Sequence, residues 1–324
     1  MTLALSPPDI QFISGDEVAK QLSVRAATQA VEEALRAGLD PDADAPRSSI
    51  PTARGHFLLM PSEFKRYCGV KVASVAPDNP SEGRPRINGS YLLFDAHTLA
   101  PLALLDGIAL TSLRTPAVSA VAVDQLARAD AHRLLLFGTG PQAWNHIEAI
   151  KSVRPITEVI VVARSTRSAQ DFTARYAAFD PSIDIGIGRA EDVRHADIVA
   201  CCTSSAEPLF DGTLLTDDST VVAIGSHEPD RREVDDVTIA RSLVFVESVA
   251  TATSEAGDIV IANNNGVLDV STLISLADLL CANLRCVAAD RPRFFKSVGM
   301  AWEDLVVAAA VYEKLRPTRL SPAS

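Results

Sequence analysis

The sequence predicts an α/β protein with two domains, one of which is built on a doubly wound parallel sheet. Its length of 324 residues suits two domains, at roughly 100–200 residues for each. From residue 133 onward, short runs rich in Val, Ile and Leu alternate with helical segments, as in a parallel sheet covered on both faces. Before residue 107, strand-like runs follow one another directly, which indicates a mainly antiparallel sheet in an α+β unit.

The first domain begins with a helix, predicted over residues 15–37 because apolar side chains recur there at helical spacing. The segment 41–49 is polar and interrupted by proline, and it has the composition of a linker. A second helix, predicted over residues 110–127, contains Pro116, which either delays its start or kinks it. The strands predicted between these two helices cover residues 56–60, 69–75, 90–96 and 102–106.

The second domain alternates strands and helices. Its strands are predicted over residues 133–138, 157–163, 182–188, 197–203, 220–226 and 242–248, and its first helices over 141–153 and 168–179. The carboxyl edge of such a sheet is where open α/β domains bind their ligands. A last amphipathic helix is predicted over residues 300–315.

Composition excludes several classes of protein. Apolar residues make up 47% and charged residues 22%, as in an ordinary globular protein. A net charge of −11 disfavours binding to nucleic acid. There is no apolar run of the roughly 18–20 residues that a membrane helix needs, and the N-terminus lacks the basic start of a secretory signal. The five cysteines form no CxxC pair, so we expect a reducing cytoplasm, and no metal-binding motif is present.

The sharpest local motif is a glycine-rich turn between a predicted strand and a predicted helix. It has the pattern G-x-G-x-x-A and consists of Gly138, Thr139, Gly140, Pro141, Gln142 and Ala143. The first glycine allows a tight turn, the second allows close approach of a pyrophosphate, and the alanine allows close packing of helix on strand. The helix N-terminus adds unpaired N–H groups and a partial positive charge. The motif therefore predicts a dinucleotide site.

The end of the next strand indicates which dinucleotide binds. NAD sites usually place Asp or Glu there to accept hydrogen bonds from the ribose hydroxyls. This chain instead has Arg164, Ser165, Thr166 and Arg167. An arginine with neighbouring hydroxyls suits a 2′-phosphate. The sequence thus predicts NADP(H) in preference to NAD(H).

Several segments in the same order resemble the ornithine cyclodeaminase/μ-crystallin family. They are GVKVAS (69–74), DGIALTSLRTPAVSA (106–120), LFGTGPQA (136–143), CTSSAEPLF (202–210), EAGDI (255–259) and FKSVGMAWEDL (295–305). The resemblance implies a homodimer with a substrate-binding and dimerisation domain over 1–120 and 297–324, onto which the last helix packs. It also implies a Rossmann domain over 121–296, and chemistry at the α-carbon of an amino acid.

The resemblance assigns the binding of a substrate carboxylate to one lysine and two arginines, which correspond here to Lys71, Arg114 and Arg47. Arginine and lysine side chains supply the charge that a carboxylate needs. Lys71 lies between two valines of an apolar strand, and alternation places its side chain on the opposite face from theirs. Further cofactor contacts are expected at Thr115, Thr203, Ser204, Ser297 and Gly299, although each of these could equally be a helix cap or a turn residue.

The sequence departs from the family pattern after the strand predicted at 220–226. Cyclodeaminases carry an aspartate in this turn, and this chain has His227 in its place. The departure argues against true cyclodeaminase activity. With an ordinary pKa near 6.5, His227 could transfer a proton or contact the nicotinamide or substrate, or it could be a plain loop histidine. Lys71 and His227 are the candidate catalytic residues.

The function expected from these residues is NAD(P)H-dependent reduction of a cyclic imino acid, such as Δ1-pyrroline-2-carboxylate or Δ1-piperideine-2-carboxylate, in amino-acid metabolism. Three alternatives remain open: an amino-acid dehydrogenase of the alanine type, a divergent ornithine cyclodeaminase, and a non-catalytic protein that binds NADPH and a small carboxylate. The expected partners are a small imino or amino acid and a second copy of the chain, with neither nucleic acid nor membrane.

Overall fold

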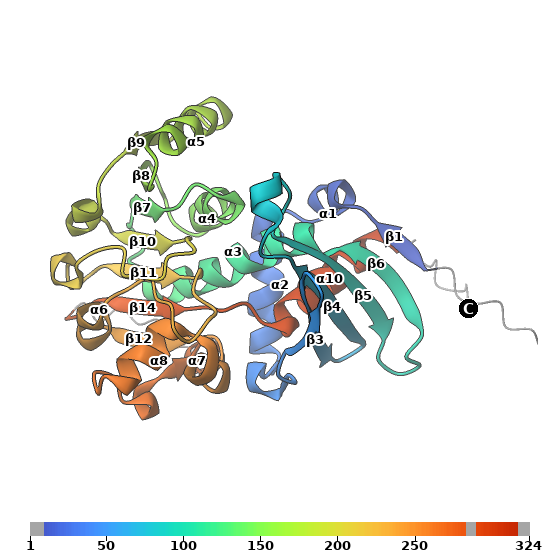
Figure 1. The fold of residues 1–324 in the computed structure, drawn as a ribbon. Coiled ribbons are helices and arrows are strands. Elements are labelled where there is room, and N and C mark those ends of the chain that lie inside the picture. Colours follow the sequence, from blue (N-terminus) through green and yellow to red (C-terminus); the bar gives the residue numbers. More distant parts are fainter. Residues whose placement is uncertain (1–9, 283–289, 317–324) are drawn as a thin grey trace, which may run out of the picture. The chain divides into compact units, whose positions relative to one another are not determined.

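The computed structural model describes residues 10–282 and 290–316, which divide into two compact units (Figure 1). Within these residues, the first unit comprises 10–30, 44–114 and 300–316, and the second comprises 31–43, 115–282 and 290–299. Residues 1–9 and 317–324 of the predicted first domain, and 283–289 of the predicted second domain, lie outside the described residues. Among the helices that are described, none is long and apolar enough to cross a membrane.

The first unit contains a six-stranded sheet in the order β1-β6-β5-β4-β3-β2. Strands β2 to β6 pair antiparallel, as the run of consecutive strands predicts, and β1 pairs parallel with β6. The strands are β1 (Gln11–Ile13), β2 (Ser48–Thr52), β3 (Gly55–Phe64), β4 (Tyr67–Val75), β5 (Ile87–Asp95) and β6 (Pro101–Asp106).

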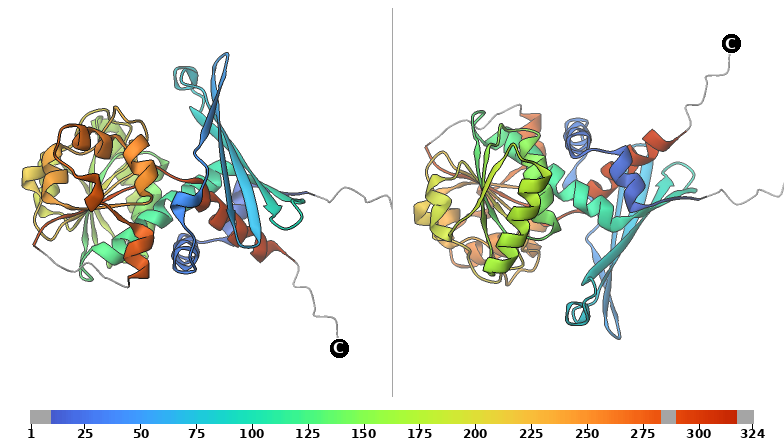
Figure 2. Two further views of the ribbon diagram at one scale, coloured as in Figure 1. Left: turned by 90° about the horizontal axis from the view of Figure 1, so that it is seen from below. Right: turned by 90° about the horizontal axis from the view of Figure 1, so that it is seen from above.

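One face of this sheet packs against helix α10 (Ala301–Leu315), as Figure 2 shows. In β4 every second residue, from Tyr67 through Lys71 to Val75, is buried on that side, and the residues between them are only half-buried. This alternation is the period of a strand with one covered face. The half-buried face is apolar along one row of paired positions: Phe12, Leu104, Leu92, Val70 and Pro61.

The second unit is built on an eight-stranded sheet in the order β13-β12-β14-β11-β10-β7-β8-β9, in which all neighbours pair parallel. Helices cover both of its faces (Figure 2), which confirms the predicted doubly wound domain. The strands are β7 (Arg133–Phe137), β8 (Glu158–Val162), β9 (Asp184–Ile187), β10 (Ile198–Cys201), β11 (Thr220–Ala223), β12 (Leu243–Val246), β13 (Ile274–Ser275) and β14 (Arg293–Lys296).

The helices of the second unit are mostly short. Those that lie wholly within it are α4 (Pro141–Lys151), α5 (Thr166–Phe179), α6 (Asp236–Arg241), α7 (Val249–Glu255), α8 (Gly257–Asn264) and α9 (Leu276–Cys281). Its short 3₁₀ helices are η1 (Pro41–Ala43), η3 (Ala190–His195), η4 (Gly212–Leu214) and η5 (Val270–Thr272), and η2 (Asn79–Glu82) belongs to the first unit.

Three local predictions needed correction or completion. The predicted helix over 15–37 is two helices, α1 (Gly15–Gln21) and α2 (Val24–Arg36), because the Ser23 hydroxyl accepts a hydrogen bond from Ala26 N and starts a new helix. The segment 41–49 contains both η1 and the boundary between the two units, and its Asp44 accepts a hydrogen bond of 2.8 Å from Trp302 N. Helix α3 (Gly107–Leu126) starts before Pro116 and continues through it.

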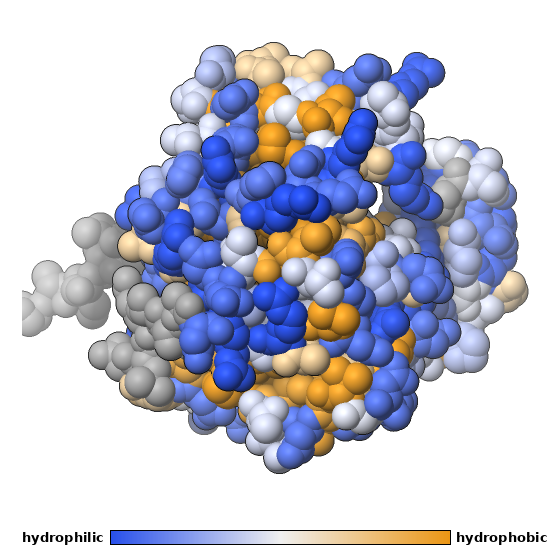
Figure 3. All heavy atoms as spheres, turned by 90° about the vertical axis from the view of Figure 1, so that its left-hand side faces the viewer, coloured by the Kyte–Doolittle hydropathy of each residue, from blue (hydrophilic) through white to orange (hydrophobic). Residues whose placement is uncertain are grey.

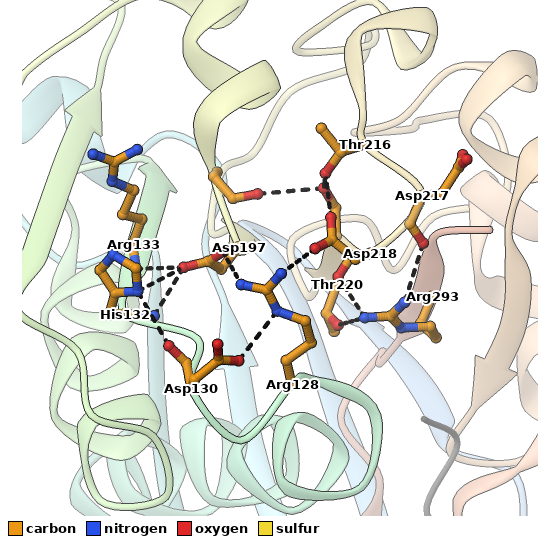
Figure 4. Close-up of polar contacts among 12 residues, drawn as sticks. Arg128, Asp130, His132, Arg133, Asp197, Thr216, Asp217, Asp218, Thr220 and Arg293 are labelled. Atoms are coloured by element: carbon orange, nitrogen blue, oxygen red, sulfur yellow. Dashed lines mark hydrogen bonds and ion pairs between the residues drawn. The ribbon is translucent and has the colours of Figure 1, made fainter. Parts of the chain in front are cut away.

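The amino ends of the second-unit strands carry a network of charges (Figure 4). Arg128 contacts Asp197, directly before strand β10, and Asp218, two residues before strand β11. Buried Arg293 donates from Nε to Leu126 O at 3.0 Å, and Arg154 donates to Asp124 O and Ala127 O. These bonds satisfy carbonyl groups at the end of α3. The network therefore fixes α3 at the sheet edge opposite the carboxyl ends of the strands.

Hydrophilic residues predominate on the face shown in Figure 3, and hydrophobic residues gather there in separate groups. The large exposed apolar side chains of the second unit likewise come from separate elements, such as Phe179 in α5, Ile187 in β9 and Val237 in α6. The apolar row on the first-unit sheet differs from them, because its members are neighbours across five strands.

Candidate functional sites in the two units

The glycine-rich turn has the geometry that dinucleotide binding needs. Gly138 has a φ of +113°, and a Cβ there would lie 2.5 Å from Cys202 O, so both conformation and space require glycine. A Cβ on Gly140 would meet nothing within 4 Å, which leaves open space above the turn. Gly140 is the N-cap of α4, Pro141 is in its first turn, and Ala143 is buried. The helix N-terminus thus points its free N–H groups at a space where a pyrophosphate fits.

A cavity of about 930 Å³ lies at the carboxyl ends of β7, β8 and β10. The predicted cofactor residues that line it are Gly138, Thr139, Gly140, Arg164, Ser165, Thr203 and Ser204. Its volume is within the range of cofactor sites. Seven of the predicted contacts, from three separate segments, therefore come together around one space.

The other predicted cofactor residues have different surroundings. Arg167 points to solvent with 92% of its side chain exposed, and its nearest carboxylate oxygen, on Asp171, is 3.9 Å away. Thr115 is buried in α3, and Ser297 N donates to Ala223 O at 3.1 Å. Gly299 has a φ of +74°. Pro141, Gln142, Ala143 and Thr166 belong to the first turns of α4 and α5 rather than to the lining of the cavity.

Part of the cavity wall consists of residues that the sequence motifs did not indicate. Its further lining residues are Phe137, Val162, Ala163, Ser168, Cys202, Ser205, Ala206, Leu209 and Arg231. Arg231 donates a hydrogen bond to Ser204 O, and its Nε lies 3.5 Å from a carboxylate oxygen of Glu228. The position of Cys202 and Ser205 beside Thr203 was an available signal, because residues that follow a strand of this sheet share its carboxyl edge.

In the first unit, Lys71 is a buried cation held by two side chains. It is 5% exposed. Its ammonium group donates to Thr111 Oγ1 and lies 3.1 and 3.3 Å from the carboxylate oxygens of Asp304. Burial lowers the pKa of Lys71, and the Asp304 carboxylate opposes this shift. These three oxygens equal in number the three donors of an ammonium group.

Arg114 is the second buried cation of this unit. Its Nη1 donates to Glu303 Oε2 at 2.7 Å, and its Nε lies 3.5 Å from Asp304 Oδ1. Helix α3 carries Arg114 and Thr111, strand β4 carries Lys71, and the first turn of α10 carries both acids. Glu303 and Asp304 were not among the predicted site residues, although both belong to the FKSVGMAWEDL segment.

The remaining two predicted residues lie in loops. Arg47 is half-buried directly before β2. His227 is exposed in the turn after β11, and its Nδ1 lies 3.3 Å from Gly225 O. Among the residues described by the structure, no three His, Cys, Asp or Glu side chains are grouped as metal ligands would be.

A doubly wound parallel sheet, a strand–turn–helix glycine motif and a cavity behind it define a dinucleotide-binding protein. The chain belongs to the ornithine cyclodeaminase/mu-crystallin family, whose sequence model matches residues 10–319. It is 35% identical over 268 residues to the Delta(1)-pyrroline-2-carboxylate reductase of Colwellia psychrerythraea, covering 80% of this chain and 84% of the relative.

Solved structures of the family share the fold over nearly the whole chain. The Thermococcus litoralis Delta(1)-pyrroline-2-carboxylate reductase, in complex with NADH and L-proline, has a TM-score of 0.88 and 30% identity, covering 94% of this chain and 97% of that one. An archaeal alanine dehydrogenase dimer with bound NAD has a TM-score of 0.87 and 27% identity, covering 94% and 95%. The expected family and fold class are thereby confirmed.

Proposed function

We propose that this protein is an NAD(P)H-dependent reductase of cyclic imino acids of the Δ1-pyrroline-2-carboxylate or Δ1-piperideine-2-carboxylate type. The observation that carries the proposal is the buried pair of cations Lys71 and Arg114, to which we assign the substrate carboxylate. The 35% identity to a pyrroline-carboxylate reductase and the likeness to a reductase solved with L-proline support the same substrate class.

In this proposal Lys71, Arg114 and Arg47 bind the substrate carboxylate. The two buried cations are fixed before substrate arrives, because Thr111, Glu303 and Asp304 already hold them. A fixed cation loses little conformational freedom when it binds a carboxylate, so the imine carbon is positioned at small entropic cost. Arg47 adds a third cation from the segment before β2.

The reaction converts C=N into CH–NH, so it needs one hydride on carbon and one proton on nitrogen. The bound dinucleotide supplies the hydride. The proton comes with a protonated imine or from a nearby acid, and Lys71, whose pKa burial lowers, is a candidate for that role. His227 is the second candidate for proton transfer, since its ordinary pKa is near 6.5.

The cavity residues fit a dinucleotide, and we propose that NADP(H) is preferred to NAD(H). The open space at Gly140 and the N-terminus of α4 suit the pyrophosphate. Arg164 and Ser165 line the cavity directly after β8, where a 2′-phosphate on the adenosine ribose would bind. The segment 163–167 has no acidic residue to repel that phosphate. Thr115, Thr203, Ser204, Ser297 and Gly299 remain proposed contacts.

The direct test is oxidation of NADPH and NADH by the purified protein with Δ1-pyrroline-2-carboxylate, followed by nicotinamide absorbance. Fast turnover with proline as product is expected, with NADPH favoured. Turnover with NADH alone would retain the reaction and reject the cofactor preference. No turnover on either cyclic imine, together with reduction of NAD(P)⁺ by alanine or ammonia release from ornithine, would assign one of the family's other reactions.

We also propose that the protein is a homodimer formed through the outer face of the six-stranded sheet. Phe12 is 64% exposed there, and its row continues through Leu104, Leu92, Val70 and Pro61. An apolar row across five strands is unfavourable in water and suits a self-complementary interface. The solved alanine dehydrogenase is a dimer, which supports the proposal.

Substitution of Leu92 by Asp is expected to dissociate this dimer, because it would bury a charge in the centre of the interface. A loss of roughly 2 kcal/mol or more of binding free energy raises the dissociation constant more than about 30-fold. Light scattering across a dilution series measures it. Val237→Asp, on α6 of the second unit, is the control. Equal dissociation constants for wild type and Leu92→Asp would place the interface elsewhere.

A further inference from the structure

Glu233 is a buried carboxylate that joins two loops of the second unit. It lies between β11 and α6 and is 0% exposed. Its Oε1 accepts hydrogen bonds from Thr203 N at 2.8 Å and from Thr203 Oγ1 at 2.7 Å. Its Oε2 accepts from Gly225 N at 2.7 Å. Both oxygens are therefore occupied by donors, and the donors come from the loops after β10 and after β11.

These bonds reach the wall of the dinucleotide cavity. Thr203 lines the cavity, and its hydroxyl accepts from Ser205 N at 3.2 Å, which also belongs to the lining. Because the Thr203 hydroxyl donates to Glu233, its lone pairs are turned toward Ser205. Gly225 packs so closely on this loop that a Cβ would overlap Thr203 O. The carboxylate thus sets the conformation of one side of the cavity without lining it.

The surroundings of Glu233 contain an excess of negative charge. Asp258 in α8 accepts from Glu233 N at 2.7 Å and Val234 N at 2.9 Å. Lys296 in β14 lies 3.1 Å from the other oxygen of Asp258, so a single buried lysine faces two buried acids. The thiols that face Glu233 are those of Cys201, the last residue of β10, and of Cys202, directly after it, and burial raises the pKa of both well above its usual value.

Burial raises the pKa of Glu233 to about 7, Lys296 opposes this shift and Asp258 adds to it. A protonated carboxyl has a donor in place of one acceptor. Each oxygen of Glu233 accepts from a backbone N–H group, Oε1 from Thr203 and Oε2 from Gly225. A proton on either oxygen therefore weakens the hydrogen bond to one of the two loops. The connection between the loops therefore depends on the ionised carboxylate.

We propose that Glu233 is a positioning residue for the dinucleotide: its ionised carboxylate holds the loops of Thr203 and Gly225 in the arrangement that binds cofactor, and protonation releases them. This inference rests on the dinucleotide site of the proposed function. It predicts that cofactor affinity decreases as the pH falls through neutrality, with the change in binding rather than in the maximal rate.

The test measures the dissociation constant of NADH by fluorescence from about pH 6 to about pH 8.5. NADH is the appropriate probe because the 2′-phosphate of NADPH itself titrates near pH 6. Wild type should bind up to about tenfold more weakly at the acidic end. Glu233→Gln keeps the shape but puts an amide NH₂ against an N–H donor, so it should bind about tenfold more weakly at every pH, with a flat profile.

Glu207→Gln is the matched control, since Glu207 is an exposed acid on the loop that follows Thr203, and it should retain the wild-type constant and profile. His227→Ala separates the nearby histidine: a profile that persists in Glu233→Gln and disappears in His227→Ala would overturn the inference. A flat wild-type profile would overturn it without any variant. Failure of wild type to bind either NADH or NADPH would instead reject the proposed function.

Discussion

Each unit contains a cluster of buried charged side chains, and the two clusters differ in their balance of acids and cations. The first-unit cluster, which consists of Lys71, Arg114, Glu303 and Asp304, has two cations and two acids. The second-unit cluster, which consists of Glu233, Asp258 and Lys296, has two acids and one cation. All seven side chains are less than a tenth exposed. The first cluster is electrically balanced, whereas the second retains one unmatched acid that takes up a proton near neutral pH.

The two clusters also differ in what their buried acids bind. In the balanced cluster the acids contact the cations directly, and their effect is to keep Lys71 and Arg114 charged and in place away from water. In the unbalanced cluster the acids mainly accept hydrogen bonds from backbone N–H groups of loops. Loss of a cation in the first cluster should therefore abolish binding of the imino acid. Loss of Glu233 in the second cluster should change the pH dependence of dinucleotide binding.

The largest effect is expected from Lys71→Met. It removes a contact to the substrate carboxylate and leaves Asp304 with less compensation, so kcat/KM for the imino acid should fall at least about a hundredfold. The free energy of unfolding should fall by about 3–5 kcal/mol. Steady-state kinetics and urea unfolding measure the two quantities.

The double variant Lys71→Met/Asp304→Leu distinguishes the two causes. Replacing both members of a buried ion pair with apolar side chains is often neutral for stability. The double variant should therefore recover most of the stability and none of the activity. Recovery of activity would show that Lys71 acts only through Asp304 and does not contact substrate.

A smaller effect is expected on the pH dependence of stability in the second unit. The pKa of Glu233 is raised from 4.5 to about 7 by burial, so the folded state binds more protons than the unfolded state between these values. Stability contributed by this group is thus present at low pH and decreases as the pH rises from about 4.5 to 7. Relative to wild type, Glu233→Gln should become more stable over that range, by about 3 kcal/mol at most.

His146 should show the opposite sign in the same unit. It is buried in α4, where its Nδ1 donates to Gln142 O at 2.8 Å and its Nε2 accepts from Ser119 Oγ at 2.9 Å. Burial lowers its pKa to about 4. The unfolded state binds the extra proton here, so this stability is lost as the pH falls from about 6.5 to 4. Urea unfolding of His146→Gln and Glu233→Gln across the range should give slopes of opposite sign relative to wild type; equal slopes would contradict the assignment.

Local patterns in the sequence were sufficient to predict part of the dinucleotide site and part of the buried cluster around Lys71. The glycine turn was predictable because its conformation depends on six consecutive residues, and φ at Gly138 is indeed positive. The strand around Lys71 was predictable from its alternation. The second helix at Val24 was not, because the apolar spacing continues through Ser23 and hides the break.

The side chains that contact the site residues could not be predicted from such local patterns. Asp304 meets Lys71 across 233 positions of sequence, and Glu233 meets Thr203 across 30. Neither spacing corresponds to a helix or strand period. Only the packing of α10 on β4, and of the loop after β11 on the loop after β10, brings these acids to their partners.

The smallest effect concerns an arginine that is exposed rather than buried. Arg164 lines the dinucleotide cavity at the end of β8, whereas Arg167 lies three residues further on and is 92% exposed. If Arg164 binds the 2′-phosphate, Arg164→Ala should lower the preference for NADPH over NADH about tenfold, because a charge-assisted bond is worth about 1.5–3 kcal/mol. Arg167→Ala should change the preference less than about twofold, because an exposed arginine contributes little. Ratios of kcat/KM for the two cofactors measure both variants, and equal effects would mean that the loop acts through its general charge. Neither variant should alter the free energy of unfolding, because neither arginine compensates a buried acid. The two exposed arginines differ in this respect from the charged residues of the two buried clusters.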